Sequence, residues 1–155
     1  MEVLKGTAAG VRYTVHVSGG RDDVSTRHHA IFKLGQTTVV FDSGAPPLIS
    51  EGDRIVVAGR VRGRVLLADA YLNQTALVRG DAGRRYYLAA MLFNLLLGGV
   101  GLALGLFWPR IVGGEMDWGP RGMLILAGAV FSALGFVSLY RWLRIRRAVK
   151  LLKGA

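Results

Sequence analysis

The residues best suited to metal binding or acid–base chemistry are the three histidines of the chain, His16, His28 and His29. Two of them are adjacent, and adjacent residues of a strand point to opposite faces, so they make a poor shared metal site. The neighbouring pair Asp22-Asp23 has the oxygen ligands that a cation needs, but a polar loop tip explains it equally well. We therefore expect no metal centre.

The rest of the sequence carries no pattern typical of an active site. The chain has no cysteine, which excludes thiolate nucleophiles, disulfides and cysteine-ligated zinc. It contains no G-x-S-x-G, Walker A or H-E-x-x-H motif, and no two carboxylates stand at a spacing that suggests acid–base work. These absences predict a protein that is not an enzyme and needs no cofactor.

The positive charge of the chain is unevenly distributed. The net charge is +10, with ten basic and seven acidic residues in 1–80, but ten basic and three acidic residues in 81–155. Most of the charge thus belongs to the half that also holds the long apolar runs. Basic residues beside membrane spans set orientation and bind anionic lipid, so the charge does not require a nucleic acid partner.

Two uncharged apolar stretches are long enough to be transmembrane helices. Residues 86–108 give a helix of about 34 Å and residues 122–140 one of about 28 Å, against a hydrocarbon thickness of about 30 Å. Aromatic residues, which favour membrane interfaces, flank both stretches. They are Tyr86, Tyr87, Trp108, Trp118, Tyr140 and Trp142. We predict a transmembrane hairpin over residues 81–140.

Flanking charges predict the orientation of this hairpin. Nine basic residues precede the first span closely or follow the second, whereas the connection 109–121 holds two basic and two acidic residues. The positive-inside rule then places both termini in the cytoplasm. The N-terminal sequence lacks the apolar region of a signal peptide. We expect a multi-pass protein of the bacterial inner membrane, with residues 1–80 in the cytosol.

Small residues recur at helix-packing spacing within both predicted spans. They are Gly98, Gly101 and Gly105 in the first span, and Gly128 and Ser132 in the second. Small residues let helix backbones approach closely where no hydrophobic force drives association. The pattern fits packing of the two spans on each other, and it also fits oligomerisation or docking on a larger membrane protein.

Residues 141–155 continue the second span as a basic, moderately amphipathic helical tail. Apolar residues including Trp142, Ile145 and Leu152 fall on one stripe of this helix, beside a basic one. We expect the basic side chains to contact the headgroups of an anionic inner leaflet. These residues are Arg144, Arg146, Arg147, Lys150 and Lys153. An RNA-binding tail is the alternative.

The first eighty residues are predicted to be β-structure throughout. Residues 11–17 alternate apolar and polar side chains with a period of two. Further β-rich runs follow at 29–34, 37–41, 54–61 and 64–72. Short strands without an intervening helix favour a small barrel over a sandwich. The predicted fold class is a small all-β barrel, followed by two transmembrane α-helices and a basic C-terminal helical tail.

The segment 48–75 resembles the closing two strands of an OB-fold barrel. It contains a Gly-Asp turn at Gly52-Asp53, an apolar strand ending at Gly59, a basic hairpin and a second apolar strand. It is similar to the anticodon-binding type of OB-fold and to the barrels of NfeD-type membrane proteins. The resemblance implies an OB-like barrel, placed here before the membrane spans instead of after them as in NfeD-type proteins.

Basic residues of the predicted barrel make nucleic acid binding one functional alternative. They lie around one hairpin, in a loop and on a neighbouring strand: Arg60, Arg62, Arg64, Arg21, Arg27 and Lys33. Single-strand binding also needs exposed aromatic platforms, and a small core needs most of the four aromatic residues of this half. We therefore favour an accessory or scaffold subunit whose barrel binds a protein partner. Membrane lipid and further copies of the chain are the other expected contacts.

Overall fold

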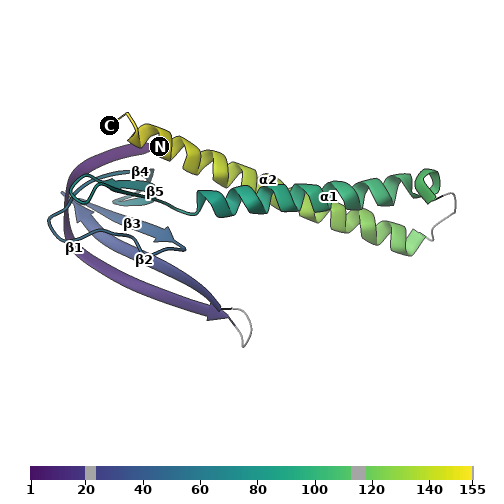
Figure 1. The fold of residues 1–155 in the computed structure, drawn as a ribbon, viewed down its shortest axis with the longest axis horizontal. Helices are drawn as coiled ribbons and strands as arrows, with labels where there is room; N and C mark the ends of the chain where they lie inside the picture. Colours follow the sequence, from purple (N-terminus) through teal and green to yellow (C-terminus); the bar gives the residue numbers. More distant parts are fainter. Residues whose placement is uncertain (20–23, 113–117, 155) are drawn as a thin grey trace. The chain divides into compact units, whose positions relative to one another are not determined.

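The computed structural model describes residues 1–19, 24–112 and 118–154, which form two compact units (Figure 1). The first unit contains Met1–Arg84 together with Arg144–Ala155, and the second contains Arg85–Leu143. The first unit holds a β-barrel and the second a pair of helices. The end of the chain therefore belongs to the same unit as its beginning, whereas the sequence predicted a separate tail from residue 141.

Six strands build the barrel unit, in the order β3-β2-β1-β4-β5-β6. The strands are β1 (Glu2–Gly19), β2 (Val24–Leu34), β3 (Thr37–Ser43), β4 (Arg54–Arg62), β5 (Val65–Asn73) and β6 (Val78–Asp81). A parallel pairing between β3 and β5 closes the first five strands into a barrel, and β6 pairs with the other edge of β5. This closed barrel confirms the OB-like fold predicted from the sequence.

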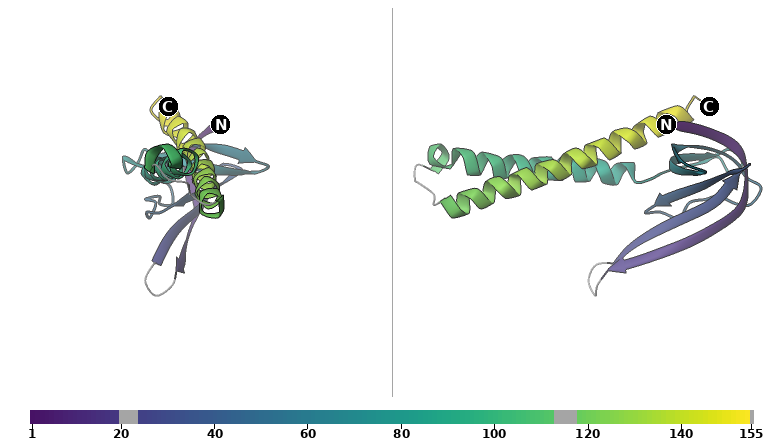
Figure 2. Two further views of the ribbon diagram at one scale, coloured as in Figure 1. Left: turned by 90° about the vertical axis from the view of Figure 1, so that its right-hand side faces the viewer. Right: turned by 180° about the vertical axis from the view of Figure 1, so that it is seen from behind.

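β1 pairs with two different strands, β4 and β2, because it bends at a glycine. Residues 2–7 of β1 pair with β4, and its residues from Ala8 onward pair with β2. The register shifts between Ala9 and Arg12, where Gly10 has a φ of +63°, a left-handed conformation that suits glycine. Farther along, residues 16–19 of β1 pair only with residues 24–27 of β2, as a two-stranded arm (Figure 2).

The carboxylate of Glu51 holds this bend. Its two oxygens accept hydrogen bonds from the N–H groups of Gly10, at 2.9 Å, and Val11, at 3.0 Å. The bond from Val11, followed by that from Gly10, lowers the pKa of the Glu51 carboxyl below its ordinary value. The folded barrel therefore favours the charged form of Glu51.

Replacing Glu51 by glutamine should destabilise the barrel at neutral pH but not in acid. Because the folded state lowers the pKa, the stabilisation by Glu51 is complete above the ordinary glutamate pKa of about 4.3 and is lost as pH falls through the lower folded value. Urea unfolding of the parent and E51Q across this range measures the effect. E2Q, at an exposed glutamate of β1, is the control. Equal stabilities of parent and E51Q at pH 7 would contradict the prediction.

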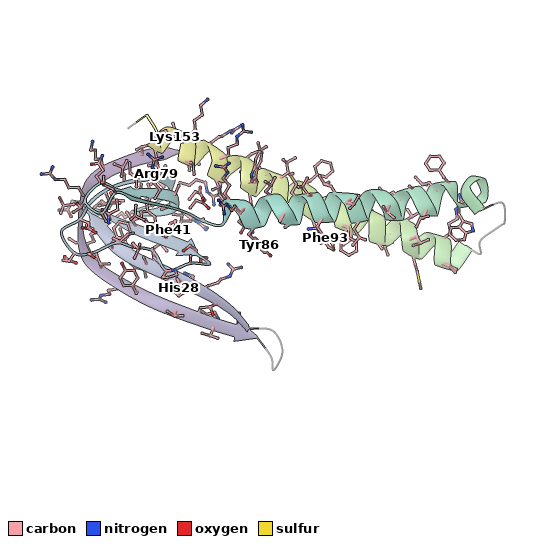
Figure 3. All side chains as sticks on the ribbon, viewed as in Figure 1. His28, Phe41, Arg79, Tyr86, Phe93 and Lys153 are labelled. Atoms are coloured by element: carbon pink, nitrogen blue, oxygen red, sulfur yellow. The ribbon has the colours of Figure 1, made fainter. Side chains whose placement is uncertain are left out.

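The barrel core is filled by the inward-facing side chains of its strands and of the loop before β4. Twelve buried residues form it: Ala8, Ala30, Phe32, Leu34, Val39, Phe41, Ile49, Ile55, Val57, Leu66, Ala68 and Tyr71. Phe41 points into the barrel (Figure 3) and meets Tyr71 edge to face, with ring centroids 5.0 Å apart. Gly59 lies at a β-bulge, where a Cβ atom would come within 2.1 Å of the Leu67 carbonyl oxygen. The bulge therefore requires glycine.

Two long helices follow the barrel: α1 (Arg84–Val112) and α2 (Trp118–Leu152). Asp81 caps α1, because its Oδ1 accepts the N–H groups of Gly83, at 3.0 Å, and Arg84, at 2.7 Å. Within the stretches Arg84–Trp108 and Gly119–Leu152, 18-residue windows reach mean hydropathies of 2.0 and 2.1, so both helices are long and apolar enough to cross a membrane. These stretches contain the two predicted spans, and α2 continues without a break into the predicted tail.

Candidate functional site

The outside of the barrel brings together part of the predicted basic surface. Strand pairing places Lys33, Arg60 and Arg62, all exposed, in two neighbouring rows of outward-facing residues. The first row is Lys33, Thr38, Val65 and Arg62, and the second is Arg12, Ile31, Val40, Leu67 and Arg60. We call the residues of these two rows the outer wall. Sequence reasoning missed Arg12, because only the register between β1 and β2 brings it there.

Four of the five residues in the middle of the outer wall are aliphatic, and the fifth is Thr38. Ile31 is 39% exposed, and Val40, Val65 and Leu67 are partly exposed. Their neighbours along the chain point into the core, and alternation along each strand leaves these side chains outside. Each of the two rows thus begins and ends with a cation, and the side chains between these cations form a mainly aliphatic strip.

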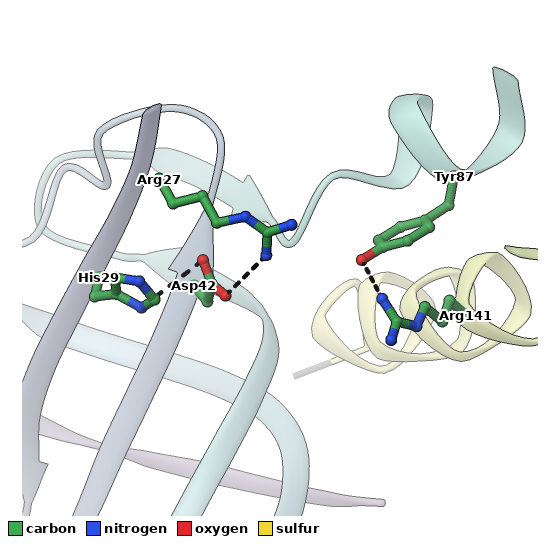
Figure 4. A network of polar contacts seen from close by, with 5 residues as sticks. All are labelled: Arg27, His29, Asp42, Tyr87 and Arg141. Carbon is green, nitrogen blue, oxygen red and sulfur yellow. Dashed lines mark hydrogen bonds and ion pairs between the residues drawn. The ribbon is translucent and has the colours of Figure 1, made fainter. Parts of the chain in front are cut away.

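The other predicted basic residues of the barrel lie elsewhere. Arg64 is exposed in the turn between β4 and β5. Arg27 and His29 both contact Asp42, with Arg27 Nη1 3.6 Å and His29 Nδ1 3.8 Å from the carboxylate (Figure 4). Arg21 lies outside the described residues, as do Asp22 and Asp23. Within the described part of the chain, no three His, Asp or Glu side chains are grouped as metal ligands would be.

Three of the four aromatic residues of the barrel are buried and cannot serve as stacking platforms. Phe32, Phe41 and Tyr71 expose no more than 3% of their surface. Burial raises the pKa of Tyr71, whose hydroxyl oxygen accepts the N–H of Leu48 at 2.9 Å. Tyr13 is half exposed, but its hydroxyl donates to the carbonyl of Ile49 and accepts the N–H of the same residue. The outer wall itself contains no aromatic residue, and stacking of single-stranded nucleic acid depends on such residues.

The last turns of α2 pack on the barrel. Ala148 and Leu152 form a second buried cluster with Val56, Ala58 and Ala70 of β4 and β5. These three residues of the barrel face outward, on the same side of the sheet as the outer wall but farther from the hairpin between β4 and β5. The C-terminal segment of α2 therefore covers one part of the outside of the barrel.

Arg144 joins this segment to the barrel by a buried ion pair. Its Nη2 lies 2.8 Å from Oδ1 of Asp69, a residue only 4% exposed at the β-bulge of β5. This differs from the predicted contact of Arg144 with lipid headgroups, because a carboxylate buried by the fold needs a cation beside it. The other residues predicted to contact headgroups are exposed: Arg146, Arg147, Lys150 and Lys153.

All the small residues predicted for helix packing meet between α1 and α2. A Cβ atom on Gly98 would lie 2.4 Å from Ser132 Oγ, and one on Gly128 would lie 2.6 Å from the backbone nitrogen of Leu102. Gly101 also approaches Gly128, and Gly105 approaches Ile125. The same residues therefore pack the two helices of one chain together, which favours the first interpretation of the small-residue pattern.

Polar contacts link the two helices as well. Arg121 Nε donates to the Gly105 carbonyl at 2.8 Å, an oxygen that lacks its usual intrahelical donor because residue 109 is proline. Arg141 Nη1 donates to the Tyr87 hydroxyl at 2.9 Å, and its guanidinium lies 5.5 Å from the centroid of that ring (Figure 4). Sequence reasoning identified neither contact, because each depends on how α1 and α2 are aligned.

Comparison of the chain with models of protein families, with curated proteins and with solved structures finds no match. The OB-like architecture therefore rests on the strand order and on the parallel pairing of β3 with β5. The candidate surfaces are the outer wall of the barrel and the exposed side chains of the two helices.

Proposed function

We propose that this chain is a non-catalytic membrane protein whose OB-like barrel binds a protein partner, as an accessory or scaffold subunit of a membrane complex. The observation that carries the proposal is that the barrel buries most of its aromatic side chains and exposes aliphatic ones. Phe32, Phe41 and Tyr71 are in the core, while aliphatic side chains such as Ile31 lie on the outside. Exposed aliphatic surface with a polar rim is typical of protein interfaces.

We further propose that α1 and α2 cross a bacterial inner membrane, with the barrel and both termini in the cytoplasm. Two crossings return the chain to its starting side, and the packing of residues 144–155 with residues 1–84 agrees with that topology. The basic residues at the barrel ends of the helices favour the cytoplasmic side.

A second candidate function is binding of single-stranded nucleic acid, as in the anticodon-binding type of OB-fold. The observation that favours it is the set of exposed basic residues on the outer wall, Lys33, Arg60 and Arg62. The lack of an aromatic residue on that wall counts against it.

Site-specific photo-crosslinking of the full chain in its native membrane tests the proposed function. A photoreactive residue at Ile31, 39% exposed, should give discrete adducts that protease removes and nuclease leaves intact. The same residue at Leu96 of α1, 70% exposed, serves as the comparison position on a helix. Monomer alone at Ile31 and at other exposed barrel positions such as Val17 would overturn the proposal. Adducts sensitive to nuclease would establish the second candidate in its place.

A further inference from the structure

We infer that the outer wall binds an acidic, aliphatic segment of the protein partner, an inference that rests on the function proposed above. The two rows defined above bring four cations, Arg12, Lys33, Arg60 and Arg62, to one surface. Neighbouring strands lie about 4.8 Å apart, so Lys33 and Arg62, three strands apart, are separated by about 14 Å along the wall. Thr38 and Val65 lie between them, and the aliphatic residues of the second row lie beside these two.

Among the described residues, no acidic side chain of the barrel forms an ion pair with these cations. Five of them are committed to contacts elsewhere in the fold, and they are Asp42, Glu51, Asp53, Asp69 and Asp81. Asp53, for example, accepts hydrogen bonds from the N–H of Ser50 at 2.7 Å and from Asn73 Nδ2 at 2.6 Å. In the described part of the chain, none of the four wall cations forms an ion pair. The wall is therefore more positive than the net charge of the barrel suggests.

The aliphatic strip selects the class of partner. A nucleic acid would offer phosphates to the cations, but its bases would meet Ile31, Val40 and Leu67, which provide no ring for stacking. A peptide segment that combines carboxylates with aliphatic side chains satisfies both features of the wall. Its carboxylates would pair with the cations while its apolar side chains cover the strip.

Binding of defined probes to the full chain in phosphatidylcholine nanodiscs tests the inference. The probe is a fluorescein-labelled peptide that alternates glutamate with leucine or valine, measured by anisotropy. It should bind about tenfold more tightly than a glutamate–serine peptide of the same length and charge, because only the former covers the strip. Its affinity should also fall as salt is raised. An oligodeoxythymidine of matched charge is the competing probe.

Charge reversal locates the binding site. The double variant R60E/R62E should weaken binding of the glutamate–leucine peptide by about tenfold or more. It places a carboxylate at one end of each row, and this carboxylate repels the glutamates of the peptide. R54E/R79E is the matched control, since Arg54 and Arg79 are exposed residues of the same barrel outside the two rows. I31T, which keeps a β-branched side chain, should weaken binding by about threefold.

Three results would overturn the inference. One is equal binding of the two peptides, another is equal loss in R60E/R62E and in the control, and the third is tighter binding of the oligodeoxythymidine. The photo-crosslinking experiment distinguishes failure of the inference about the outer wall from failure of the proposed function. If protein adducts at Val17 persist in R60E/R62E while peptide binding to the wall is absent, the barrel still binds a protein, but at a different surface.

Discussion

Replacing Asp69 by alanine is expected to destabilise the barrel unit by about 3–5 kcal/mol, because it leaves the Arg144 guanidinium partly buried without its counter-ion. The side chains of Asp69 and Arg144 are 6% and 22% exposed, so water replaces the lost partner poorly. The second carboxylate oxygen of Asp69 and Nε of Arg144 have no hydrogen-bond partner among the described residues. These two atoms therefore do not compensate for the loss.

The destabilisation should be concentrated where α2 meets the barrel. Ala148 and Leu152 pack on Val56, Ala58 and Ala70, and Arg144 lies one turn before Ala148 on the same helix. Without the ion pair, this segment should detach before the barrel core unfolds. Hydrogen exchange of the backbone amides in residues 145–152, in detergent micelles, should accelerate in D69A more than exchange in β2 or β3.

Two variants make this prediction specific. R147A removes a positive charge like that of Arg144, but from an exposed position of the same α2 segment, and should change stability by no more than about 0.5 kcal/mol. The double variant D69L/R144L replaces both charges by apolar side chains and should recover most of the loss, because a missing pair costs less than a single buried charge. Equal urea midpoints for D69A and R147A would contradict the proposed role of the ion pair.

Much of the fold follows from local patterns in the sequence. Alternation of apolar and polar side chains located part of β1, and β-rich runs located β2 to β5, but β6 and residues 2–10 of β1 were not predicted. Uncharged runs of about twenty residues located the helices, since few soluble helices are so uniformly apolar. The small residues Gly98, Gly101 and Gly128 predicted close helix packing because their types alone allow backbones to approach.

The features that the sequence did not predict depend on contacts between distant residues. Arg144 belongs to a run of basic residues, and nothing in that run distinguishes the one that pairs with Asp69. Asp69 is the unpaired residue at the β-bulge of β5, and a bulge follows from how β4 and β5 pair, not from the sequence of either strand. In the same way, the outer wall exists because closure through β3 and β5 brings Lys33 and Arg62 into one row.

Replacing Gly98 by alanine should separate α1 from α2, whereas the same change at the adjacent Gly99 should not. A Cβ atom on Gly98 would lie 2.7 Å from the backbone nitrogen of Ser132 and 2.9 Å from the carbonyl oxygen of Gly128, neither of which can rotate away. Around Gly99, apart from its chain neighbours and the nearby backbone of its own helix, no atom of the described chain lies within 4 Å of the added carbon. Overpacking of this kind costs about 1–3 kcal/mol.

Both variants replace a glycine of α1 by alanine, so both gain the same helix propensity. A difference in stability between them therefore reports on packing. Alanine favours a helix over glycine by up to about 1 kcal/mol, so G99A should match or exceed the parent in stability while G98A falls below it. Unfolding by added dodecyl sulfate in mixed micelles, followed by circular dichroism, measures both. Equal resistance of G98A and G99A would mean that α1 and α2 do not pack through Gly98, and the small residues would then be free for contacts with another copy or a larger membrane protein.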